Sequence, residues 1–147
     1  MYKHILIPLD DSKLSAKAIK SGIALASSIK AKITGFTAMP AYQIPSEAEL
    51  MSRHAISPAE HEKRARAKAK RILARLERTA AKAGVACASS FALSDRPDEA
   101  IVKAAEKNGC DLILMVSHGR SGLSALLNGS FTRGVLAKAK VPTLVYR

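Results

Sequence analysis

Short apolar runs alternate with segments of helical periodicity along this chain, and that alternation constrains the fold more than any other feature. The run DLILMV at residues 111–116 is almost entirely apolar, as in a central parallel strand covered on both faces. Residues 14–29 instead repeat apolar side chains every three or four positions, which predicts a helix with one packed face. Because strands separated by helices form right-handed crossovers, we expect a parallel sheet with helices on both sides.

The same criteria divide the rest of the chain into strands, helices and one long loop. We expect strands at residues 2–9, 31–38, 85–93, 111–116 and 143–146. We expect helices at residues 14–29, 60–83 and 130–138, and another from Pro97 towards Gly109. The inward positions of the helix at 60–83 are predicted to be Ala65, Ala69, Ile72, Leu76 and Ala80. Prolines bracket residues 39–58, which we interpret as a surface loop with at most one helical turn.

The composition indicates one domain spanning residues 1–147. Hydrophobic residues make up 48% of the chain, which is enough for a single core. Cys87 and Cys110 are too few and too far apart for a disulfide framework or a zinc site, so we expect small buried side chains there. No apolar run approaches the roughly 20 residues of a membrane-spanning helix, and the first residues lack signal-peptide features. These observations favour a reducing, cytoplasmic location.

Two loops have the chemistry of a ligand site, because ligands of such sheets bind at the carboxyl ends of the strands. The first follows the first strand at Pro8 to Asp10, and Asp10 to Ser12 are also suited to cap the next helix. The second runs from Ser117 to Ser130, where Gly129 and Ser130 open a helix whose free N–H groups suit a phosphate. Equally, the glycines could serve only turns and Ser130 only a cap. The loop is not a P-loop, since no Gly-Lys-Ser/Thr follows the glycines.

Several segments together resemble the universal stress protein family over essentially the whole chain. They are the opening KHILIPLDDS, the strand and loop DLILMVSHGR, the nine residues between Gly119 and Gly129, the Gly-Ser pair and the closing VPTLV. The nucleotide-binding branch of that family uses Gly-x-x-Gly, nine residues, then Gly-Ser or Gly-Thr. Val116 stands where that motif has its first glycine, and Gly122 does not replace it.

The resemblance implies a Rossmann-like, three-layer α/β/α sandwich with a five-stranded parallel sheet in the order 3-2-1-4-5. It further implies a stress-response protein that binds ATP or a related adenine nucleotide, with or without Mg²⁺. Such a protein acts as a switch or adaptor with at most weak ATP hydrolysis, and it forms a homodimer through residues 143–146. Carried across by position, the nucleotide-binding residues are Pro8, Leu9, Asp10, Thr37, Ala38, Val116, His118, Gly119, Arg120, Gly129, Ser130, Phe131 and Thr132.

Two alternatives remain beside ATP binding. One is a nucleotide-free dimeric adaptor of the same fold. The other is nucleic-acid binding by the basic helix at residues 62–82, because the chain has 24 basic and 12 acidic residues and a net charge of +12. Most charged helix faces are simply solvated, and no aromatic residues are interleaved in this one, so we do not expect nucleic acid as the partner. His118 has no partner residues nearby in sequence that would make it catalytic, and we expect no metal site.

Overall fold

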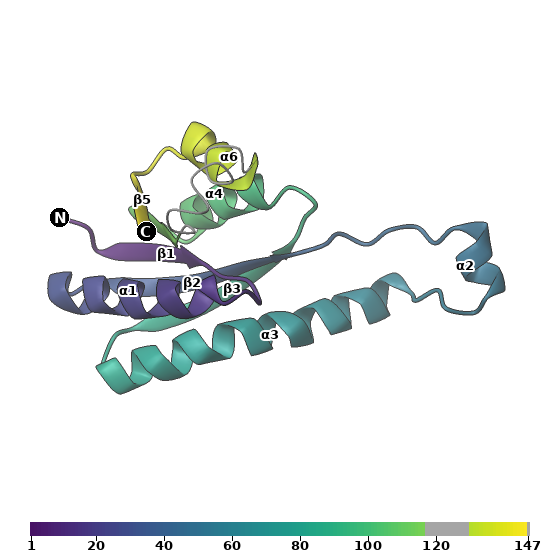
Figure 1. Cartoon of the computed structure of the whole chain (residues 1–147), viewed down its shortest axis with the longest axis horizontal. Coiled ribbons are helices and arrows are strands. Elements are labelled where there is room, and N and C mark those ends of the chain that lie inside the picture. Colours follow the sequence, from purple (N-terminus) through teal and green to yellow (C-terminus); the bar gives the residue numbers. More distant parts are fainter. Residues whose placement is uncertain (117–129, 147) are drawn as a thin grey trace.

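The chain, seen in a computed structural model that describes residues 1–116 and 130–146, alternates strands and helices as the sequence predicts (Figure 1). The strands are β1 (His4–Pro8), β2 (Lys32–Met39), β3 (Cys87–Leu93), β4 (Leu112–Val116) and β5 (Thr143–Tyr146). The helices are α1 (Leu14–Ile29), α2 (Glu47–Met51), α3 (Pro58–Ala83), α4 (Pro97–Lys107) and α6 (Ser130–Lys138). The bounds predicted for α1, α6 and β5 are confirmed to the residue.

The five strands form one parallel sheet in the order β3-β2-β1-β4-β5, as predicted. Helices α1 and α3 lie on one face, and α4 and α6 on the other (Figure 1). Alternate residues of β1 face opposite layers: Ile5 and Ile7 pack with α1 and α3, whereas Leu6 packs with α4. The chain winds away from β1 in both directions, so the carboxyl ends of β1 and β4 form the switch point of the sheet.

The inward side of α3 differs from the prediction at one position. Leu73 is buried, with 3% of its surface exposed, whereas Ile72 is only half-buried. Both fit the apolar period, and the sheet decides between them because Leu73 faces Gly35 of β2, where there is no side chain. The helix ends as predicted at Gly84, which adopts the left-handed conformation with φ of 68°.

The start of α1 is a second correction. The residue that caps α1 is Lys13, and no side chain caps the helix by a hydrogen bond. The carboxylate of Asp10 instead accepts a hydrogen bond from the backbone N–H of Ser12 at 2.9 Å, two residues along. Asp10 therefore shapes the loop before α1 and does not cap the helix.

The loop predicted at residues 39–58 contains the five-residue helix α2 and projects beyond the sheet beside the first turns of α3 (Figure 1). At its base the backbone N–H of Ala41 donates to Asp95 at 3.1 Å, and the ring of His61 is 2.8 Å from the carbonyl of Pro40. Further out, the hydroxyl of Tyr42 donates to the carbonyl of Ile56 at 2.9 Å. The Tyr42 bond joins the outgoing and returning halves of the loop, and the other two tie its outgoing half to the segment after β3 and to α3.

None of the helices in the described part of the chain is long and apolar enough to cross a membrane. Of the two cysteines, Cys110 is buried as predicted, whereas Cys87 is half-buried on the edge strand β3.

Candidate nucleotide site

A cavity of about 330 Å³ opens at the carboxyl ends of β1, β2 and β4, at the switch point of the sheet. Its described lining comes from both helical layers as well as from the strands. The residues are Pro8, Leu9, Asp10, Ser12, Leu14, Ser15, Ala18, Phe36, Ala38, Pro97, Ile101, Met115, Val116 and Phe131. Most of these side chains are apolar, and the polar ones belong to the turn between β1 and α1 and to the first turn of α1. The cavity therefore has apolar walls and one polar rim.

The polar rim is held by hydrogen bonds within the β1–α1 turn. The backbone N–H of Leu9 donates to the carbonyl of Phe36 at 2.8 Å, which extends the pairing of β1 with β2 up to the cavity. The hydroxyl of Ser15 donates to the backbone carbonyl of Asp10 at 2.7 Å and accepts from the N–H of Asp10 at 3.0 Å. Together with the Asp10–Ser12 bond, these contacts fix the Asp10 carboxylate at the edge of the cavity.

Asp10 carries a negative charge at neutral pH. Burial raises the pKa of this carboxyl, whereas hydrogen bonds from Ser12 and Ser15 to the carboxylate lower it. The hydrogen bonds together outweigh burial, so the net pKa lies below its ordinary value. An ionised carboxylate only accepts hydrogen bonds. It therefore suits the hydroxyl or amino groups of a ligand and repels a phosphate.

The walls suit a flat apolar group. Phe36 and Ala38 lie two residues apart on β2 and so share the face towards α4, where Ile101 lies. Met115 and Val116 contribute from the end of β4. A ring system in this space gains from the burial of apolar surface, while its polar edge reaches the rim at Asp10.

The structure brings six of the predicted site residues together around the cavity: Pro8, Leu9, Asp10, Ala38, Val116 and Phe131. Two others lie apart from its described lining. Thr37 is 1% exposed and points to the opposite face of β2 from Ala38, and its hydroxyl has no partner among the described residues. Thr132 is half-buried in the first turn of α6.

The remaining predicted residues fall on the glycine-rich loop. His118, Gly119, Arg120 and Gly129 lie outside the described residues. Ser130 is the first residue of α6, as predicted. The loop between Ser117 and Ser130 thus stays a prediction except for its helical end.

Sequence reasoning missed more than half of the described lining. Phe36 carried a signal, because it alternates with Ala38 on one strand. Ser15 carried a weaker one, as a hydroxyl near the start of a helix. Pro97 and Ile101 carried none, because α4 reaches the cavity only through its packing across the sheet.

No cluster of three or more His, Cys, Asp or Glu side chains that could hold a metal occurs among residues 1–116 and 130–146. A metal in this cavity would have Asp10 as its only described carboxylate ligand from the lining.

Comparison with known proteins places the chain among sequences of one family. The profile of the "Universal stress protein family" matches residues 1–147. Universal stress protein MJ0531 of Methanocaldococcus jannaschii is 30% identical over 152 aligned residues, covering 100% of this chain and 83% of that protein. Universal stress protein MJ0577 of the same organism is 47% identical over 51 residues, which are 35% of this chain and 32% of that protein.

Solved structures share the fold over nearly the full chain. The structure of MJ0577 is similar with a TM-score of 0.75 and 28% identity, covering 99% of this chain and 96% of that one. A universal stress protein from Archaeoglobus fulgidus in complex with dAMP has a TM-score of 0.68 and 16% identity, covering 99% and 98% of the two chains. At 16% identity the likeness shows the fold alone.

Proposed function

This chain belongs to the universal stress protein family, and from that premise we propose that it binds ATP or a related adenine nucleotide in the cavity at the switch point. The observation that carries the proposal is the cavity itself, with a volume of about 330 Å³, apolar walls and an ionised Asp10 at the rim. That volume lies in the range of about 300–1,000 Å³ typical of small-molecule sites. Support comes from proteins of this fold solved with dAMP, cAMP and AMP.

In the proposed complex the adenine lies between the β2 and β4 walls of the cavity. Asp10 accepts a hydrogen bond from the ribose or from the adenine amino group. The phosphates, which Asp10 would repel, extend towards Ser130 at the first turn of α6, where the positive end of the helix dipole favours an anion. The glycines of the 117–129 loop, Gly119 and Gly129, remain sequence-based predictions for the same phosphates.

Filling the cavity should test the proposal. Ala38→Leu adds three carbon atoms to a lining residue and should weaken ATP binding by at least about tenfold. Ala88→Leu, on the exposed side of the neighbouring strand β3, makes the same change away from the cavity and should leave affinity unchanged. Binding is measured by isothermal titration with ATP, ADP and AMP, with and without Mg²⁺.

The titration also separates the proposal from its main alternative. If the native protein releases no nucleotide on denaturation and binds none at millimolar ATP, the nucleotide-free adaptor is the correct interpretation. An unchanged affinity in Ala38→Leu would mean that ATP binds elsewhere, and an equal loss in both leucine variants would refute the specific role of the cavity. Phosphate release measured alongside tests the accompanying proposal that hydrolysis is weak at most, and we propose further that the bound nucleotide acts as a switch.

We also propose a homodimer through β5. This strand is an edge of the sheet, and Leu144 and Tyr146 are 41% and 45% exposed on it. Pairing of two copies by two-fold symmetry would cover both edges. Light scattering after gel filtration should give a dimer mass that Leu144→Lys abolishes, while Leu136→Lys, at an exposed leucine of α6, retains it. A monomer of the unmodified chain at micromolar concentration would refute the dimer.

A further inference from the structure

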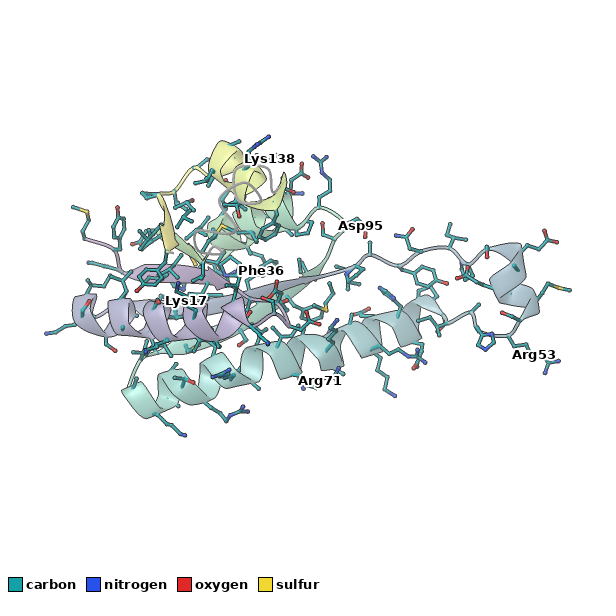
Figure 2. All side chains as sticks on the ribbon, viewed as in Figure 1. Lys17, Phe36, Arg53, Arg71, Asp95 and Lys138 are labelled. Atoms are coloured by element: carbon teal, nitrogen blue, oxygen red, sulfur yellow. The ribbon has the colours of Figure 1, made fainter. Side chains whose placement is uncertain are left out.

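One side of α3 carries an unbroken row of cations. The residues recur at spacings of three and four, so they share one face of the helix. They are Arg64, Lys68, Arg71, Arg75, Arg78 and Lys82, and all of them are exposed. At 1.5 Å per residue the row extends over about 27 Å. Figure 2 labels Arg71 near its middle.

The middle of this row forms one wall of a groove between α3 and the start of α1. The groove has a volume of about 430 Å³, and its cationic lining consists of Lys13, Lys68, Arg71 and Arg75. Asp10 and Asp11 lie at the loop end of the same groove. Cations from two separate elements of the chain therefore converge on one concave surface.

Most of this charge lacks an acidic partner. Lys68 is 3.3 Å from Asp11, but both side chains are largely exposed, and such pairs contribute little. Arg64 pairs with Glu60 at 3.0 Å. Within the described residues, no ion pair joins an acidic side chain to Arg71, Arg75 or Arg78. These guanidinium groups are available to an external anion.

The composition of the surface favours one class of anion. Protein interfaces are anchored by buried aromatic or apolar side chains, and α3 exposes no large hydrophobic residue. Interfaces with nucleic acid are polar and strongly positive, and arginine forks suit phosphates. Binding of single strands usually adds aromatic side chains that stack on bases, and the row has none.

Against the expectation from the sequence, and because the groove gathers cations of α1 and α3 on one surface, we propose that the row on α3 and its groove bind the phosphate backbone of double-stranded nucleic acid without reading its sequence. The groove meets the apolar cavity at Asp10, Ser12 and Ser15, whereas Lys68, Arg71 and Arg75 line the groove alone. Backbone binding of this kind releases counterions, so the logarithm of the affinity falls with the logarithm of the salt concentration by about 0.9 for each phosphate contacted. The slope of this salt dependence therefore gives the number of cationic side chains that contact phosphates.

The experiment is a fluorescence-anisotropy titration of labelled 25-base-pair DNA and RNA duplexes of arbitrary sequence, between 50 and 200 mM KCl and without nucleotide. The variant Arg71→Gln/Arg75→Gln/Arg78→Gln should lose affinity by at least about tenfold and lower the salt slope by about 2.7. The matched control Lys63→Gln/Lys70→Gln/Lys103→Gln removes the same charge from exposed positions outside the row. We expect the control to change the slope by less than about 1.

Three results would overturn the proposal. The first is no binding of either duplex by the unmodified protein at 50 mM KCl. The second is an equal loss in the two triple variants, which would show an effect of net charge alone. The third is displacement of the duplex by polyglutamate at equal charge concentration, which would assign the row to an acidic protein partner. Preference between the DNA and RNA arms shows which duplex is bound more tightly.

Discussion

Helix α3 packs closely on Gly35 of β2, so the effect of Gly35→Ala on the free energy of unfolding should depend on Leu76, which lies opposite. A Cβ at Gly35 would overlap the Cδ2 atom of Leu76 and lie 3.1 Å from that of Leu73. Leu76 is fully buried, so it has no solvent to move into. Overpacking of this kind costs about 1–3 kcal/mol of unfolding free energy. We expect Gly35→Ala to destabilise the protein by that amount.

A double-mutant cycle tests whether the contact with Leu76 causes the destabilisation by Gly35→Ala. Leu76→Ala alone should cost about 2–5 kcal/mol because it leaves a cavity. In that background the new methyl group at position 35 has room and restricts the unfolded chain, so Gly35→Ala should become neutral or stabilising by about 0.4–1 kcal/mol. The two changes should thus be non-additive by about 1–4 kcal/mol, measured by urea unfolding followed by circular dichroism.

The control is a buried residue on the other face of the sheet. Ile101→Ala removes a side chain that is 2% exposed and packs in the α4 layer, away from Gly35. Its cost should add to that of Gly35→Ala within about 0.5 kcal/mol. If the pair Gly35→Ala and Leu76→Ala is equally additive, the close approach of α3 to β2 does not determine the cost, and the reasoning fails.

Three further changes test local features. Ser57→Ala should destabilise the protein by about 1 kcal/mol in urea unfolding, because its hydroxyl accepts from a backbone N–H in the first turn of α3 at 3.1 Å; no change would contradict the cap. Burial raises the pKa of Asp111, but backbone N–H groups of residues 4 and 3 bind the carboxylate and the net pKa is lowered. The carboxylate therefore stabilises the fold above its unfolded pKa of about 3.9, and that contribution is lost as pH falls through the folded pKa. Asp111→Asn should be less stable at pH 7 and converge with the parent in acid; a constant difference across pH would argue against this. Burial raises the pKa of Cys110 to about 11, so iodoacetamide at pH 8 should label it in urea but not in the native state, as mass spectrometry of peptides would show; rapid native labelling would refute this.

The overall topology could be derived from the sequence because local signals and chain connectivity are enough to specify it. Left-handed Gly84 and Gly109, and Pro97 at a helix start, mark helix ends by conformations that few other residues adopt. Alternation of strands with helices then forces the parallel sheet. One local signal went unused: Ser46 and Glu49 form a capping box at the start of α2, a pattern readable three residues apart in the sequence.

The position of the candidate site could be predicted from the sequence, but the full set of residues that line it could not. Loops after β1 and β4 meet because their strands are neighbours, so Asp10 and Val116 were predictable members of one cavity. That Asp10 holds the turn, and does not cap α1, depends on where the hydroxyl of Ser15 lies. Ile101 enters the cavity only because α4 crosses the opposite face of the sheet.

Two pairs of neighbouring residues show what the sequence predicts and what only the tertiary structure determines. Ile72 and Leu73 both satisfy the helical period of α3, and Thr37 and Ala38 are consecutive residues near the carboxyl end of β2. Periodicity determined that one face of each element is buried. Only the tertiary structure decided which side chain meets Gly35 and which meets the cavity, because packing depends on the shape of the opposite layer, and that shape is set by residues far away in the chain.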